Sequence, residues 1–274
     1  MDNINQFGAY SAVYPNVGSI LQLNSVGNSN YNSLQTTLKI RTWHGFSSQF
    51  AYTWAHELDN MTEYRGAIQF DYLQPRLDYG SGDFDTRQNF TAFWTYDIPG
   101  SSHGPKILTH GWQLSSLWDF HGGQPFNFSL GCPAAYAQCG GTQRPGVDLI
   151  GNPFAGVNHT FNRAAGGIPW INPAAFAVPA ANDPAGNLGR NAFYGPGFAD
   201  VDLSVIKNIP VTERFKVQLR AEMFNLFNRK NFATGAGSVG SNGIVGDTIG
   251  DFNGAPGIGP GEPFNMQLVA KIIF

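Results

Sequence analysis

Residues that could bind a metal ion are few, and their spacing is poor. Asp247, Asp251 and Asn253, with Gly254, loosely resemble a calcium-binding loop. Their spacing fails the EF-hand pattern, which also requires a glutamate further along the chain. We therefore interpret this stretch as a flexible loop. No other stretch suggests a metal site or a cofactor site, so we expect the protein to need neither.

The histidines and paired charges form no catalytic pattern. No HExxH sequence and no i, i+4 histidine pair occurs. His121 falls on the polar side of a predicted strand and could touch a solute, but we favour a hydrogen-bonded structural role. Arg220 and Glu222 share one face of a strand, and we interpret them as part of a structural charge ladder. The sequence thus predicts that the protein is not an enzyme. The histidines are His44, His56, His103, His110, His121 and His159.

Two cysteines, Cys132 and Cys139, lie in a stretch rich in Gly, Pro and Ala. They do not form a CxxC pair, and no nearby histidine suggests a zinc site. The favoured interpretation is a small disulfide loop in an oxidising compartment. The alternative is a pair of free thiols.

Residues 264–274, at the end of the chain, show the clearest periodicity. Apolar and polar side chains alternate there, as expected of a strand with one oily and one wet face. A strand that crosses a bilayer at a tilt needs about 9–11 residues, so the length also fits. A soluble edge strand would share the pattern. The apolar positions are Phe264, Met266, Leu268, Ala270, Ile272 and Phe274.

The composition suits a protein with much surface turned away from water. Charged residues make up 13% of the chain and aromatic residues 14%, and the net charge is −3. No basic excess suggests a nucleic-acid partner. No run of about 18 apolar residues suggests a transmembrane helix. A membrane β-barrel explains these facts, because its hydrophobicity alternates along each strand. A Gly-rich secreted β-protein is the competing explanation.

Six earlier stretches alternate in the same way, which predicts seven antiparallel strands and an all-β fold. Ten charged residues in the strand interiors all fall on the face opposite the apolar one. In a barrel they would face a wet lumen, where a charge costs little. The strands are 31–42, 46–56, 85–97, 111–121, 198–207, 215–227 and 264–274. The charged residues are Lys39, Arg41, Arg87, Asp119, Asp200, Asp202, Lys216, Arg220, Glu222 and Lys271.

The connections between these strands alternate between short and long. The long ones are 59–84, 129–197 and 229–263. Outer-membrane barrels have short periplasmic turns and longer extracellular loops, so Phe274 should lie at the periplasmic rim. Aromatic residues then gather at both ends of the strands, as the two membrane interfaces require. We therefore predict an outer-membrane barrel in contact with lipid.

Seven is an odd number of strands, and a single-chain bacterial barrel has an even number. Seven strands alone would leave two open edges in lipid, which the bilayer does not tolerate. Residues 1–29 are expected to be a loop before the first strand and contain no secretion signal. We therefore expect residues 30–274 to be the C-terminal part of a larger barrel.

Several short motifs resemble one family when taken in order. They include Asn30-Tyr31-Asn32-Ser33-Leu34-Gln35, Asp83-Phe84-Asp85-Thr86-Arg87, Gly111-Trp112-Gln113-Leu114-Ser115, Gly186-Asn187-Leu188-Gly189-Arg190-Asn191 and Arg220-Ala221-Glu222-Met223-Phe224-Asn225-Leu226-Phe227-Asn228. Together they resemble the C-terminal barrel of TonB-dependent receptors of the Oar-like type. The final strand also resembles the signal that the outer-membrane barrel assembly machinery recognises.

The resemblance implies a barrel of about 22 strands with an N-terminal plug, in line with the size range of outer-membrane barrels. It also implies import of an extracellular ligand with energy relayed by TonB through an N-terminal part that this sequence lacks. It gives no catalytic or ligand-binding residues to transfer. Two alternatives remain: a complete small outer-membrane barrel that acts as an adhesin or enzyme, and a soluble carbohydrate-binding β-sandwich.

Overall fold

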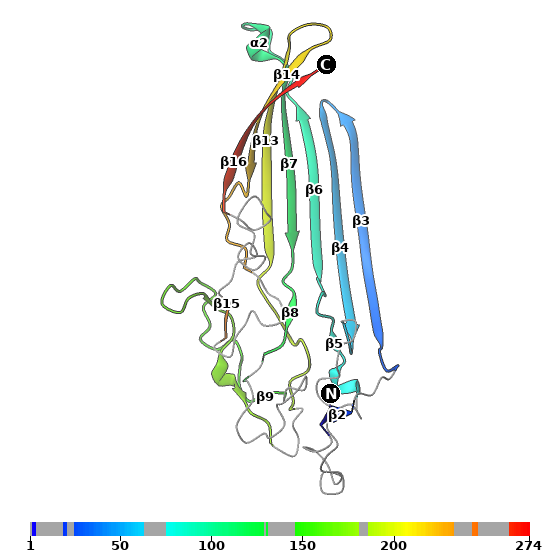
Figure 1. Cartoon of the computed structure of the whole chain (residues 1–274), viewed down its shortest axis with the longest axis vertical. Coiled ribbons are helices and arrows are strands. Elements are labelled where there is room, and N and C mark those ends of the chain that lie inside the picture. Colours follow the sequence, from blue (N-terminus) through cyan, green and yellow to red (C-terminus); the bar gives the residue numbers. More distant parts are fainter. Residues whose placement is uncertain are drawn as a thin grey trace.

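A computed structural model describes residues 2–3, 19–20, 25–62, 75–128, 130, 146–180, 186–232, 243–245 and 263–274. Within these residues, no helix is both long enough and apolar enough to cross a bilayer. The dominant feature is one sheet of seven long antiparallel strands, which stand side by side in sequence order (Figure 1). They are β3 (Ser29–Trp43), β4 (Phe46–Asp59), β6 (Gln88–Asp97), β7 (Trp112–His121), β13 (Phe198–Pro210), β14 (Lys216–Phe224) and β16 (Asn265–Ile273).

These seven strands confirm the all-β, antiparallel fold predicted from the sequence, and each matches one predicted stretch. Most boundaries differ by a few residues, and two of the differences have a clear physical reason. β6 begins at Gln88 and not at Asp85, because the Asp85 side chain binds other segments instead of continuing the ladder. β14 ends at Phe224, because Asn225 has a positive φ of 46° and its N–H donates to Asp202. β7 ends at His121 as predicted, and Pro125–Phe126 pairs with β12.

The register of the sheet places the predicted apolar positions on one continuous face. Phe50 pairs with Leu38 and Ala92, and Phe90 pairs with Tyr52 and Phe120. At the other edge, Ala221 pairs with Val205 and Leu268. Several of these side chains are more than half exposed, such as Leu268 at 72% and Leu34 at 58%. A contiguous exposed apolar face of this kind needs a nonpolar environment.

The short connections and the C-terminus lie at one end of the sheet, and the long connections lie at the other (Figure 1). The first short turn is His44–Gly45, where both residues have positive φ. The connection between β6 and β7 holds a four-residue helix, α2 (Lys106–Thr109). This helix was not predicted, because a single turn is too short to show helical periodicity.

The long connections contain their own small hydrophobic core, which the sequence did not reveal. Three two-residue strand pairs support it: β8 with β12, β9 with β11, and β10 with β15. Phe126, Phe176 and Phe193 lie buried at its centre, with ring centroids 5.7–6.0 Å apart in two of the pairs. The strand bounds are β8 Pro125–Phe126, β9 Asp148–Leu149, β10 Ile168–Pro169, β11 Phe176–Ala177, β12 Phe193–Tyr194 and β15 Ile244–Val245.

The remaining elements are short. β5 (Gly80–Ser81) pairs with the end of β4, and β1 (Asp2–Asn3) pairs with β2 (Ser19–Ile20). Two 3-10 turns, η1 (Pro75–Asp78) and η2 (Pro173–Ala175), lie in the long connections. The backbones of Gly123 and Gly195 approach closely where the chain leaves β7 for β8. Only glycine fits at position 123, because a Cβ there would lie 1.9 Å from the Gly195 carbonyl oxygen.

Candidate functional site

The face opposite the apolar one carries the charged residues of the strand interiors, while Lys207 lies near a strand end on the apolar face. The register pairs Asp119 with Asp200, and Glu222 with Gln267. Arg220 forms an ion pair with Glu222 at 3.5 Å and donates to Gln218 through Nε, which agrees with the predicted charge ladder. This polar face is suited to contact water or a polar solute, and the apolar face is not.

A pocket of about 350 Å³ opens on this polar face, at the end where the long connections lie. Its floor comes from β3, β4 and β6, and the segment 84–86 forms one wall. The volume falls within the range of about 300–1,000 Å³ that is common for small-ligand sites. The lining residues are Tyr31, Gln35, Thr53, Ala55, Glu57, Phe84, Asp85, Thr86 and Asn89.

Asp85 holds the pocket wall in place. Its buried carboxylate accepts hydrogen bonds from the Tyr194 hydroxyl at 2.7 Å and from the Glu57 backbone N–H at 2.9 Å. His56 Nδ1 lies 2.9 Å from the same carboxylate. Both oxygens of Asp85 therefore have partners inside the protein, so its role is to position the wall.

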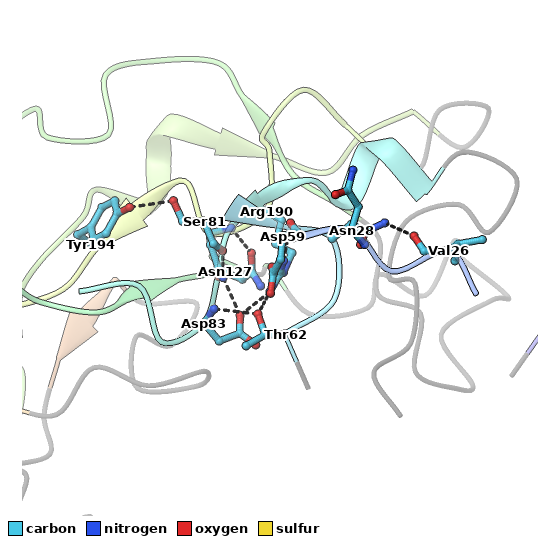
Figure 2. Close-up of polar contacts among 11 residues, drawn as sticks. Val26, Asn28, Asp59, Thr62, Ser81, Asp83, Asn127, Arg190 and Tyr194 are labelled. Carbon is cyan, nitrogen blue, oxygen red and sulfur yellow. Dashed lines mark hydrogen bonds and ion pairs between the residues drawn. The ribbon is translucent and has the colours of Figure 1, made fainter. Parts of the chain in front are cut away.

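Arg190 joins the long connection between β7 and β13 to the end of the sheet. Its buried guanidinium forms ion pairs with Asp59 and, at 2.9 Å, with Asp83. It also donates to the Thr62 hydroxyl at 2.6 Å. Asn191 adds hydrogen bonds to the Ser81 carbonyl and to Asp83. Figure 2 shows Arg190, Asp59, Asp83 and Thr62 close together. We call these four residues and Asn191 the Arg190 clasp.

The charge states within this region follow from its burial and its partners. Burial lowers the pKa of Arg190, but hydrogen bonds and charge from Asp59 and Asp83 outweigh burial and raise the pKa above its usual range. Burial raises the pKa of the Tyr194 hydroxyl; the bond to Ser81 opposes this and the Asp85 carboxylate adds to it. Arg190 therefore stays charged, and Tyr194 stays a neutral donor at physiological pH.

One family model, described as an outer membrane beta barrel domain, matches residues 2–267. The match covers nearly the whole chain. The chain belongs to this outer-membrane barrel family. Its seven-stranded sheet is therefore barrel wall, and the protein is located in the bacterial outer membrane. No curated protein and no solved structure matched the chain.

Membership of this family assigns the two faces of the sheet. The apolar face of the barrel contacts lipid, and the polar face lines the lumen. The pocket therefore opens into the lumen. Because outer-membrane barrels carry their long loops on the extracellular side, we infer that the pocket and the Arg190 clasp lie toward the outside.

The histidines are dispersed through the barrel and have individual structural roles. His121 stacks on Phe198 with ring centroids 4.8 Å apart, and its Nδ1 lies 2.9 Å from the Gly122 carbonyl, as its predicted structural role requires. His159 stacks on Trp170, and His56 binds Asp85. The other three lie at the short-turn end, in or next to connections. Across the described part of the chain, no three metal-binding side chains come together.

Lys207 lies on the lipid face near the short-turn end of β13. Its ammonium donates to the carbonyl oxygens of Leu108 and His110 and lies 4.6 Å from the centroid of the Trp112 ring. The ammonium is thus bound at the C-terminal end of α2, and Lys207 is only 7% exposed. This arrangement explains how a cation is tolerated on the apolar face.

Other residues singled out from the sequence lie outside the described residues. These are Cys132 and Cys139, the disulfide candidates, and Asp247, Asp251, Asn253 and Gly254. Conversely, the sequence analysis gave no role to Arg190. The sequence did contain one signal: Arg190 is the only charged residue of the otherwise neutral, glycine-containing motif Gly186–Asn191.

Proposed function

We propose that this barrel is part of a TonB-dependent receptor of the Oar-like type, which binds an extracellular ligand and imports it. The observation that carries the proposal is the contact between two motifs that resemble this family. Asp83 and Asp85 of one motif receive hydrogen bonds from Arg190 and Asn191 of the other and from nearby Tyr194. The two motifs are thus in direct contact at the end of the sheet where the long connections lie, next to the pocket.

The chemistry of the site supports binding and not catalysis. Asp85 is saturated by donors, and Arg190 is neutralised by two carboxylates. Neither group is free to act as an acid, a base or a nucleophile. In the proposed receptor, the polar lumenal face guides the ligand inward, and TonB supplies energy through an N-terminal part of the protein.

The last strand supports a second partner, the outer-membrane barrel assembly machinery. β16 presents Met266, Leu268 and Ile272 on the lipid face, and Phe274 lies at the short-turn rim, 6.4 Å from the Phe215 ring centroid. In the proposal, the machinery binds these alternate apolar residues and the terminal aromatic. Replacing Phe274 with Ala should reduce the amount of folded protein in the outer membrane, while Asn265→Ala should not.

The receptor proposal is tested by the DNA upstream of Met1 in the source organism. The proposal predicts an in-frame plug domain, a TonB-binding segment and a secretion signal. The complete protein should then bind the periplasmic domain of TonB in a pull-down, and deletion of the TonB-binding segment should abolish that binding. A stop codon and a promoter directly upstream of Met1 would contradict the proposal.

A further inference from the structure

The lumenal pocket contains one carboxylate with no partner. Among the described residues, the Glu57 side chain makes no hydrogen bond and no ion pair, while its backbone N–H binds Asp85. Gly82 leaves room for this carboxylate, because a Cβ at Gly82 would lie 2.8 Å from Glu57 Cδ. The pocket is therefore built with Glu57 in its lining, and none of the described residues forms an ion pair with its carboxylate.

The charges around the pocket do not balance. Within the described residues, four carboxylates and two guanidiniums lie in or next to the pocket, and His56 also pairs with Asp85. Negative charge is in excess even when His56 is counted as a cation. Arg190 is already engaged by two of the carboxylates, and Arg87 lies 4.0 Å from Asp85. The carboxylates are Glu57, Asp59, Asp83 and Asp85, and the guanidiniums are Arg87 and Arg190.

Two aromatic side chains line the same pocket and are largely open to solvent. Tyr31 is 58% exposed and Phe84 is 64% exposed. The faces of aromatic rings attract organic cations, because the ring carries partial negative charge on its faces. A pocket lined by one carboxylate and two aromatic residues is a suitable environment for an ammonium or guanidinium group.

The same lining argues against a metal ion. Calcium requires 6–8 oxygen ligands, and the two oxygens of Asp85 are already occupied by donors within the protein. Glu57 alone does not supply a coordination sphere. An organic cation needs only one counter-charge and apolar surfaces beside it.

We propose that this pocket binds an organic cation, with Glu57 as the counter-ion and Tyr31 and Phe84 beside the cation. The group bound is the ammonium or guanidinium of a peptide side chain or of a small amine. This inference rests on the proposed receptor function, because it names the class of ligand that the receptor takes from outside.

The test measures binding to the purified complete protein that contains this chain, folded in detergent, at low ionic strength. Two peptides with blocked, uncharged ends serve as probes in calorimetry. One is acetyl-Gly-Lys-Gly-amide, and the other has norleucine in place of lysine and so lacks the ammonium group. The lysine peptide should bind about ten-fold more tightly, the size expected of a partly desolvated cation site. Equal affinities for the two peptides would overturn the proposal.

Variants locate the site. Glu57→Gln should lower the affinity for the lysine peptide about ten-fold and leave the affinity for the norleucine peptide unchanged. Phe84→Leu should lower the affinity for the lysine peptide by a smaller factor. Glu213→Gln removes the same charge from the exposed turn between β13 and β14 at the other end of the barrel and should change nothing. Unchanged lysine-peptide binding in Glu57→Gln would also overturn the proposal.

The variants are expected to fold, because the Glu57 carboxylate has no partner to lose and Phe84 is mostly exposed. Since the assay contains no TonB, its outcome is independent of import. A negative result here with a positive TonB pull-down would remove the cation site and leave the receptor function. The opposite pair of results would leave a cation-binding barrel without TonB-driven import.

Discussion

At the scale of single residues, the clearest feature is the buried cation of Arg190, which joins distant parts of the chain. Arg190 lies 131 positions from Asp59 in sequence, yet the two form a buried ion pair. Removing one partner of such a pair leaves an uncompensated buried charge, which costs about 3–5 kcal/mol. We therefore expect the Arg190 clasp to contribute strongly to holding the long loop between β7 and β13 against the sheet.

Replacing Arg190 with Ala should release this loop without unfolding the barrel wall. We expect faster proteolytic cleavage within residues 146–197, by about 100-fold if the loss of about 3–5 kcal/mol is partly recovered by hydration of the freed carboxylates. Arg163→Ala is the matched control, because Arg163 is an exposed arginine in the same loop. Equal cleavage rates in the two variants would show that the clasp does not hold the loop.

Lys207 provides a second prediction at this scale. Lys207→Met keeps the length of the side chain but removes its bonds to Leu108 and His110 and its contact with Trp112. We expect the free energy of unfolding in lipid vesicles to fall by about 1–2 kcal/mol. The control is Lys216→Met on the neighbouring strand, where the lysine is exposed on the lumenal side. A more stable Lys207→Met barrel would mean that the buried charge is a net cost.

At the scale of elements, each strand has two faces with opposite requirements. Leu203 and Ser204 are adjacent in the middle of β13, and their partners show that they point to opposite sides. Leu203 pairs with Met223 and Ser116 on the lipid face, while Ser204 pairs with Glu222 and Ser115 on the lumenal face. The alternation is a local property of the chain, which is why all seven strands could be predicted from the sequence.

This alternation predicts unequal effects of the same substitution at neighbouring positions. Leu203→Arg should destabilise the folded barrel by roughly 2–4 kcal/mol, because it places a cation near the bilayer midplane. Ser204→Arg should cost little, because the lumen is wet and Glu222 lies beside it. Guanidinium unfolding in vesicles measures both values. Similar losses in the two variants would contradict the assignment of the faces.

The long connections could not be predicted in the same way. Their core brings together Phe126, Phe176 and Phe193, which are far apart in sequence and follow no period. The pocket likewise needs β3, β4, β6 and the 84–86 segment in their final positions. Pairwise contacts between distant, aperiodic segments carry no local signal, so neither the loop core nor the clasp could be predicted. The family resemblance drew attention to the segments 83–87 and 186–191, but it did not predict that they touch.

At the scale of the whole molecule, one apolar and one polar face run continuously across seven strands, and the long connections are gathered at one end. The family match and this arrangement agree on an outer-membrane barrel wall. The described sheet has two edge strands, β3 and β16, each with one long-strand neighbour. The strand total of about 22 remains a prediction.

The central claim is that one face of this sheet contacts lipid and the other contacts water. We would test it with a nitroxide spin label at each position from 200 to 206 of β13, in the complete protein folded in vesicles, with its cysteines, Cys132 and Cys139 among them, replaced by Ser. The account predicts that labels at Val201, Leu203 and Val205 collide with oxygen dissolved in the bilayer. Labels at Asp200, Asp202, Ser204 and Ile206 should collide with a water-soluble nickel reagent. Accessibility to the nickel reagent at all seven positions would contradict the account.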